Sequence, residues 1–352
     1  MAEPRQSKSL KRRDEQARLL ATQERVTLIA LGVLAAVAIL AIAGVVWGVI
    51  LPPRAHVITV GDQQFNAREV QKRASFLVAG NSQVDEDPID AGVNMIRRDE
   101  ILLQAGAPQV GEITGDDITK AIRTRIGVAD DVSAEDYTKS YDLFLKGNSL
   151  DKPTFERMVR AQVVYDRLAK KYEPEVGTTG LQFHLMGVSA RDQGKVRQMR
   201  EAVASGGDFT AKAFELGLVQ EAAQADFGWV LPPTDGYRKD TVKVQDLQAG
   251  QMSEVITRDG GLQYDLYRMA EREDARAYTD DQKKTLSTRK VDEWIEQQRQ
   301  TVAVTEDLSD GERRWILKQV AKEAARLAEV RAASAPAPGA GSASLPIPQK
   351  AP

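Results

Sequence analysis

The strongest feature of the hydrophobic pattern is one long apolar run over residues 26–51, which contains no charged side chain. At ~1.5 Å per residue, a helix over this run would be ~39 Å long, more than the ~30 Å hydrocarbon core of a bilayer. A helix in a soluble core would carry a polar face, and this run has none. The apolar region of a cleaved signal peptide is usually ~7–15 residues long and ends at a small-residue cleavage site. The sequence after Leu51 lacks such a site, so the pattern predicts a retained transmembrane helix.

The residues before this run are rich in lysine and arginine. Residues 1–25 carry a basic excess, whereas the rest of the chain is acidic overall. Because basic flanks stay in the cytoplasm, we expect a cytoplasmic tail over residues 1–25. The chain is then a single-pass protein of the cell membrane, anchored by residues 26–51, with its N-terminus cytoplasmic and its bulk extracytoplasmic. An acidic outer part argues against nucleic acid as a partner.

A helical domain is predicted over residues 54–175, in which amphipathic helices follow a short strand hairpin that begins near Val57. Each helix repeats apolar residues at helical spacing, and most begin at a capping signal. These signals are Asn66 with Glu69, Asp87 before Pro88, Thr114 with Asp117, Ser133 with Asp136, and Pro153 near the start of the fifth helix. The pattern predicts a small helical domain, which Pro174 ends and which a linker over residues 174–180 follows.

Strand patterns begin after the linker and extend over residues 181–270. The predicted order is strand, helix, helix, strand, an irregular segment with a short helix, and two antiparallel strands around a turn at residues 259–261. Two further helices are predicted over residues 279–332. Residues 333–352, rich in Ala, Pro, Ser and Gly, are predicted to be disordered. The fold class is therefore α+β, with an N-terminal transmembrane helix.

Composition limits the chemistry that the chain can perform. It has no cysteine, which excludes a disulfide framework and a thiol nucleophile. Its only histidines are His56 and His184, too few for a histidine-rich zinc site and a poor basis for a Ser-His-Asp system. We expect neither a cofactor nor a metal.

Two segments of the helical part resemble the N-terminal domain of SurA-type periplasmic chaperones. They are ILLQAGAPQVG at residues 101–111, similar to a leucine-rich turn of that family, and the helix over residues 150–172. Four later segments resemble the parvulin (rotamase) family of peptidyl-prolyl isomerases. They are FHLMGV at 183–188, SGGDFTAKA at 205–213, ADFGWV at 225–230 and DLQAGQMSEVIT at 246–257. The resemblance implies a helical SurA-N-like module and a parvulin-like domain.

The parvulin resemblance also implies an active site made of two histidines and a cysteine or aspartate, with apolar side chains around the proline ring. His184 matches the first histidine, and Asp265 stands where the family has the second. The cysteine or aspartate falls at Gly217. We expect His184 and Asp265 as catalytic candidates. Candidates for substrate binding are Tyr237, in the proline-ring loop, and the two aromatic residues Phe227 and Trp229.

Each of these residues has a structural interpretation as well. His184 could be an inward-facing histidine that is hydrogen-bonded to a neighbour, with Asp265 beside it as that partner. Phe227 and Trp229 could be core residues. We expect an extracytoplasmic folding factor of the parvulin type that acts on unfolded or nascent exported proteins and their proline-containing segments. Its isomerase activity is expected to be weak or lost, which leaves open whether it is an enzyme. The alternative is a structural or assembly subunit of a membrane protein complex.

Overall fold

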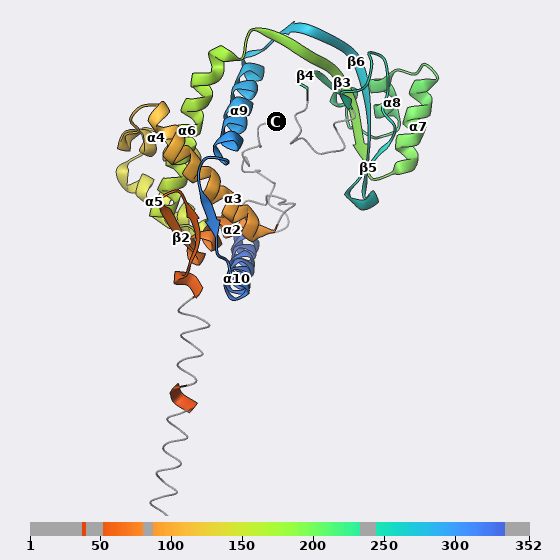
Figure 1. The fold of residues 1–352 in the computed structure, drawn as a ribbon. Helices are drawn as coiled ribbons and strands as arrows, with labels where there is room; N and C mark the ends of the chain where they lie inside the picture. The colour runs from red at the N-terminus through yellow and green to blue at the C-terminus, as the bar shows by residue number, and fades with distance from the viewer. Residues whose placement is uncertain (1–36, 40–51, 80–86, 233–243, 335–352) are drawn as a thin grey trace, which may run out of the picture. The chain divides into compact units, whose positions relative to one another are not determined.

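The computed structural model describes residues 37–39, 52–79, 87–232 and 244–334. The chain divides into two compact units, one formed by Met1–Tyr165 and Ile295–Pro352 and the other by Asp166–Trp294. Both units combine helices with antiparallel strands, so the fold class is α+β (Figure 1). Apart from residues 37–39, the predicted membrane span lies outside the described residues, as does the predicted tail beyond Ser334. Among the helices that the structure describes, none combines the length and apolar character that a membrane crossing requires.

The first unit holds a three-stranded antiparallel sheet in the order β2-β1-β7. β1 (His56–Val60) and β2 (Gln63–Asn66) form the predicted hairpin. The third strand, β7 (Val304–Glu306), was not predicted, because the sequence pattern favoured a helix that continued to Val304. The helix α9 (Asp280–Gln298) ends earlier, and β7 then pairs with β1. A strand of three residues has no readable period of its own, so only its pairing defines it.

The helices of this unit begin where the sequence predicted. Asn66 and Glu69 exchange hydrogen bonds at the start of α2, Thr114 and Asp117 form a capping box, and Ser133 accepts a hydrogen bond from the backbone N–H of Asp136. The helices are α2 (Ala67–Ala79), α3 (Pro88–Ile101), α4 (Gly115–Ile126), α5 (Ala134–Gly147), α6 (Lys152–Tyr172) and α10 (Asp310–Ser334), with a π-helical turn at Leu102–Gly106 and 3₁₀ turns at Pro52–Arg54 and Ala107–Gln109. The end of α6, from Asp166 on, and the 3₁₀ turn at Glu173–Glu175 belong to the second unit.

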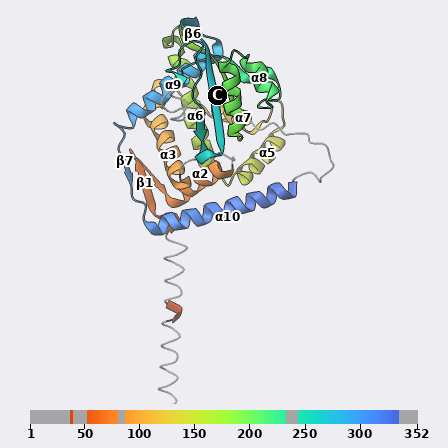
Figure 2. The ribbon, with the colours of Figure 1, turned by 90° about the vertical axis from the view of Figure 1, so that its right-hand side faces the viewer.

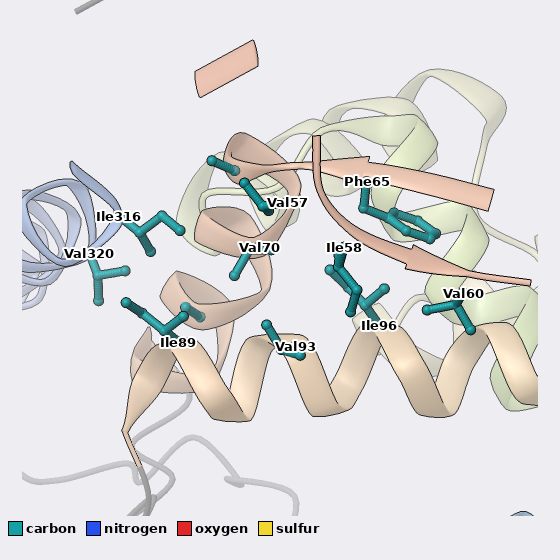
Figure 3. Close-up of a cluster of buried hydrophobic side chains, with 12 residues drawn as sticks. Val57, Ile58, Val60, Phe65, Val70, Ile89, Val93, Ile96, Ile316 and Val320 are labelled. Atoms are coloured by element: carbon teal, nitrogen blue, oxygen red, sulfur yellow. The ribbon is translucent and has the colours of Figure 1, made fainter. Parts of the chain in front are cut away.

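The main core of the first unit joins segments from both ends of the chain. α10 packs against α2 and α3, as Figure 2 shows. Figure 3 shows Ile316 and Val320 of α10 in the same cluster as residues of β1, β2, α2 and α3. The cluster comprises Val57, Ile58, Val60, Phe65, Ala67, Val70, Ala74, Ile89, Val93, Ile96, Ile316 and Val320. A second cluster joins α4, α5 and α6 around Phe155. The burial of each large apolar side chain contributes ~1.5–3 kcal/mol to the free energy of unfolding. Because Ile316 and Val320 are buried in this cluster, α10 belongs to the core of this unit.

The second unit is built on a four-stranded antiparallel sheet in the order β4-β3-β6-β5. Its elements are β3 (Thr179–Ala190), α7 (Gln193–Ala204), α8 (Phe209–Glu215), a 3₁₀ turn (Ala222–Ala225), β4 (Asp226–Val230), β5 (Ile256–Arg258), a 3₁₀ turn (Asp259–Gly261) and β6 (Gln263–Ala277). α7 and α8 pack on one face, over Val188 and Leu266. The order of the four strands and of α7 and α8 is the one that the sequence pattern predicted, although β5 begins only at Ile256. Most of the irregular segment with its predicted short helix lies outside the described residues.

β3 and β6 are longer than the pattern predicted. They pair from Thr179 opposite Ala277 to Ala190 opposite Tyr264, so part of the predicted linker over residues 174–180 is strand. The extension was missed because it carries charged side chains, such as Arg272 and Glu273, instead of an apolar alternation.

Candidate active site

His184 lies on β3 opposite Trp229 of β4. Its Nε2 atom is 2.9 Å from Oδ1 of Asp226, which fits an Nε2–H that donates to the carboxylate. Its Nδ1 atom is 3.8 Å from Oε1 of Glu271, and its ring centroid is 5.5 Å from that of Trp229. His184 therefore lies among two carboxylates and an indole.

A second hydrogen bond holds the Asp226 carboxylate in place. Its Oδ1 atom also accepts a hydrogen bond of 2.8 Å from the backbone N–H of Gly228. Gly228 has φ +64°, a left-handed conformation that favours glycine, so the chain can turn back toward the carboxylate. Sequence reasoning did not identify Asp226 as the partner of His184. The available signal was its place at the start of ADFGWV, a strand predicted in the same sheet as FHLMGV.

Asp265 lies in a separate polar network on β6, with 1% of its surface exposed. It accepts hydrogen bonds from Ser189 Oγ at 2.5 Å, from Arg258 Nη2 at 3.0 Å and from the Tyr267 hydroxyl at 3.3 Å. Nε of Arg258 is also 2.5 Å from Oδ2 of Asp265. This buried carboxylate is paired with a cation and hydrogen-bonded, as a buried charge requires.

The structure does not bring His184 and Asp265 together, and the expectation that they are neighbours was wrong. On β3, His184 is opposite Glu271, whereas Asp265 is opposite Ser189. At ~3.3 Å per residue, the separation between His184 and Ser189 along the strand is ~17 Å. Strand alternation also puts His184 on the face of Met186, which packs in the cluster of α7 and α8, and Ser189 on the opposite face.

The face opposite α7 and α8 carries two aromatic rings beside the Asp265 network. A Cβ atom at Gly187 would lie 2.6 Å from Cε2 of Phe227 and 2.7 Å from Cδ1 of Tyr267, so both rings lie directly over this glycine. Phe227 is 48% exposed. Phe227 and Tyr267 thus form an aromatic platform, and the Tyr267 hydroxyl connects it to Asp265.

The five predicted site residues are therefore divided. Phe227 lies beside Tyr267, whose hydroxyl donates a hydrogen bond to Asp265. Trp229 lies beside His184, and the Arg276 guanidinium is 4.0 Å from the centroid of the Trp229 ring. Tyr237 is outside the described residues.

The third polar position of the family pattern is a glycine in this chain. Gly217 follows α8 and has φ +64°, a conformation in which an aspartate would be strained. Glu215, a nearby carboxylate, is ion-paired with Lys212 at 2.5 Å. Within the part of the chain that the structure describes, no three histidines or acidic residues are grouped so that they could hold a metal ion.

The sequence matches no protein-family model and no curated protein. The structure matches solved structures of PrsA foldases and SurA-like chaperones at low sequence identity. One is foldase protein PrsA from Streptococcus pneumoniae, with 14% identity over 80% of this chain and 95% of that chain and a TM-score of 0.34. Another is peptidylprolyl isomerase (PrsA) from Bacillus anthracis, with 12% identity over 65% and 96% and a TM-score of 0.32. A third is a SurA-like chaperone from Campylobacter jejuni, with 10% identity over 72% and 100% and a TM-score of 0.24.

Proposed function

We propose that this chain is an extracytoplasmic folding factor that binds unfolded segments of exported proteins and retains little or no isomerase activity. The observation that carries the proposal is the aromatic platform of Phe227 and Tyr267 on the face of the sheet opposite α7 and α8. The exposed ring of Phe227 offers an apolar contact to an extended chain, including one that contains proline. Two of the parvulin-like motifs, FHLMGV and ADFGWV, lie in β3 and β4 of the same sheet and agree with this role.

The proposal of weak catalysis rests on how the polar groups are distributed. Rotation about an X–Pro bond crosses a barrier of ~18–20 kcal/mol, and a protein lowers it by placing several polar groups around the twisting bond. His184 and Asp265 are ~17 Å apart along the sheet and on opposite faces, so one substrate bond cannot contact both. Loss of a single donor at an active site typically costs ~10²–10³ in rate. The isomerisation rate should therefore be far below that of a parvulin with a complete site.

The roles that we propose follow from these positions. Phe227 contacts the client chain, and Asp265 positions the platform through the Tyr267 hydroxyl. His184 and Trp229, with Asp226, form a second surface at the β3–β4 edge that contacts polar parts of the client. Tyr237 is proposed as a further apolar contact.

Two assays on the full chain in detergent test the proposed function. We expect the chain to suppress aggregation of an unfolded client, and Phe227→Ala to reduce the affinity for client peptides at least about fivefold, as expected for an exposed aromatic anchor. Phe214→Ala is the matched control, because Phe214 is 56% exposed on α8, which packs on the other face. His184→Ala should leave the suppression intact. If the chain isomerises a proline peptide at parvulin-like rates and His184→Ala abolishes this, the proposal of a binding role is wrong.

We further propose that residues 26–51 anchor the chain in the cell membrane with residues 54–352 outside. The absence of cysteine makes a direct test possible, because a single introduced cysteine is the only thiol. Ser205→Cys should react with a membrane-impermeant maleimide on intact spheroplasts, and Ser7→Cys should react only after lysis. Labelling of Ser7→Cys before lysis would contradict the proposed orientation.

A further inference from the structure

A cavity of about 360 Å³ in the first unit is lined by four basic side chains from α2 and α6, among other residues. Its basic residues are Arg68, Lys72, Arg73 and Arg157, and its acidic residues are Glu69 and Asp151; Asn66, Pro153 and Thr154 complete the lining. The chain as a whole is acidic, with a net charge of −3. Among the lining residues cations exceed carboxylates, although Arg157 also pairs with Glu100 and Arg73 with Asp99 outside the lining. Arg68 makes no such pair in the described ranges of the chain, and its positive charge favours an anionic ligand.

Arg73 is the most unusual of these residues, because it is charged, 1% exposed and incompletely hydrogen-bonded. Its Nε and Nη1 atoms make no hydrogen bond to any of the described residues. The nearest carboxylate is that of Asp99, 3.7 Å from Nε, which is beyond hydrogen-bonding distance. Buried donors without acceptors are costly, so an acceptor that enters this cavity would relieve a deficit that the protein leaves open.

The two carboxylates in the lining are already engaged. Oε2 of Glu69 accepts a hydrogen bond from the backbone N–H of Asn66 at 2.9 Å. Asp151 pairs with Lys72 and also accepts from the backbone N–H of Thr154 at 3.1 Å. Arg68 is exposed and makes no ion pair with any described residue. The cavity thus offers Arg68 at its surface and Arg73 in its depth to an incoming anion.

Two further cavities share basic lining residues with this one. A neighbouring cavity of about 450 Å³ shares Arg68 and Lys72 and adds Lys146, Trp315 and Arg326, which is ion-paired with Glu323 of the same lining. Arg157, which binds Glu100, lines a further cavity of about 570 Å³ together with Arg160. A single small ion would need only one of these cavities. Three cavities that share lining residues fit an extended segment of polypeptide better.

We propose that the cavity between α2 and α6 binds a carboxylate of an extended client polypeptide, from a C-terminus or an Asp or Glu side chain. Guanidinium groups match the two oxygens of a carboxylate, which explains why the cavity presents arginines. The proposal rests on the client-binding function above and adds a chemical preference: acidic segments bind better than neutral ones.

The test uses labelled peptides of one length and the full chain, with fluorescence anisotropy as the readout. One peptide carries Asp and Glu and a free C-terminus, a second has the same sequence with a C-terminal amide, and a third replaces Asp and Glu by Asn and Gln. We expect the acidic peptide to bind roughly threefold to tenfold more tightly than at least one neutralised form, with a difference that shrinks as salt is added. Weaker binding of the C-terminal amide shows that the C-terminal carboxylate is the group bound. Weaker binding of the Asn/Gln peptide shows that the Asp and Glu side chains are bound.

Two variants assign the effect to this cavity. Arg68→Glu should lower the affinity for the acidic peptide by roughly threefold to tenfold. Asp151→Asn should raise this affinity, because the Asn side chain still accepts the hydrogen bond from the backbone N–H of Thr154 but no longer neutralises Lys72. Arg125→Glu, an exposed arginine on α4 outside the cavity lining, is the control and should change the affinity no more than a change in net charge does.

Several outcomes would overturn the carboxylate proposal. Equal affinity for all three peptides would do so, while leaving the folding-factor function intact if aggregation is still suppressed. Competition by inorganic phosphate but not by acetate would show a phosphate site instead. Equal weakening by Arg125→Glu would show a general charge effect. If the chain neither suppresses aggregation nor binds any peptide, it is the proposed function that fails.

Discussion

Arg157 of α6 holds the carboxylate of Glu100 at the end of α3 with two parallel hydrogen bonds, each 2.5 Å long. Glu100 is fully buried. Its Oε2 atom also lies 3.3 Å from the amide of Gln104, which in turn donates to the backbone carbonyl of Val60. This pair therefore ties α6 and the end of α3 to β1.

We predict that Arg157→Ala lowers the free energy of unfolding by about 3–5 kcal/mol, because it leaves a buried carboxylate without its cation. Arg160→Ala, on the same helix but exposed, should change it by no more than about 0.5 kcal/mol. Urea denaturation followed by circular dichroism measures both. Equal effects of the two variants would show that the pair is not a stabilising element.

A pH dependence should come from Asp99, which is buried beside Arg73. Burial raises the pKa of Asp99 from its ordinary 3.8 to about 7. Between these values the native state holds a proton that the unfolded state has lost, so stability falls as the pH rises from about 4 to 7 and is level above that range. The slope contributed by one group is at most ~1.4 kcal/mol per pH unit.

The Asp99→Asn variant isolates this contribution. The difference in unfolding free energy between the wild type and Asp99→Asn, measured in urea at a series of pH values, should change with pH between about 4 and 7 and be constant above. Other carboxylates cancel in the difference. A difference that is independent of pH would mean that Asp99 is ionised throughout this range.

The close approach of two rings at Gly187 predicts that Gly187→Ala is destabilising. An added Cβ would lie within 3 Å of both Phe227 and Tyr267, so one ring must move, at a cost of about 1–3 kcal/mol. Gly147→Ala, at the end of α5 where a Cβ meets nothing within 4 Å, should be neutral or stabilising. Thermal melts and peptide binding would test this. An unchanged melting temperature in Gly187→Ala would contradict the observed ring positions.

His184 and Asp265 should differ sharply in their effect on stability. His184→Ala should cost less than about 1 kcal/mol, because the pair with Asp226 is partly exposed. Asp265→Ala should cost about 3–5 kcal/mol, because it leaves the largely buried Arg258 without its carboxylate. Denaturation curves of the two variants provide the comparison. A stable Asp265→Ala protein that has lost a measurable isomerase activity would show that Asp265 is catalytic instead.

The sequence by itself determined the local structure of this protein. Helix starts such as Asn66 with Glu69 and Thr114 with Asp117 were predictable because both partners of a capping box lie three residues apart. The order of strands and helices in the second unit was predictable for the same reason: each element carries its own period and ends at its own turn.

Only the tertiary structure decided which residues are neighbours across the chain. β7 exists because Glu306 pairs with Ile58, and no local pattern encodes a contact between segments so far apart in sequence. The partner of His184 is Asp226 instead of Asp265 because the register of β3 against β4 and β6, with its bulges, sets which side chains meet. A shift of one residue turns a side chain to the other face of a sheet. Candidate residues such as His184 and Asp265 could therefore be proposed from the sequence, but the side chains that surround them, such as Asp226 and Tyr267, could not.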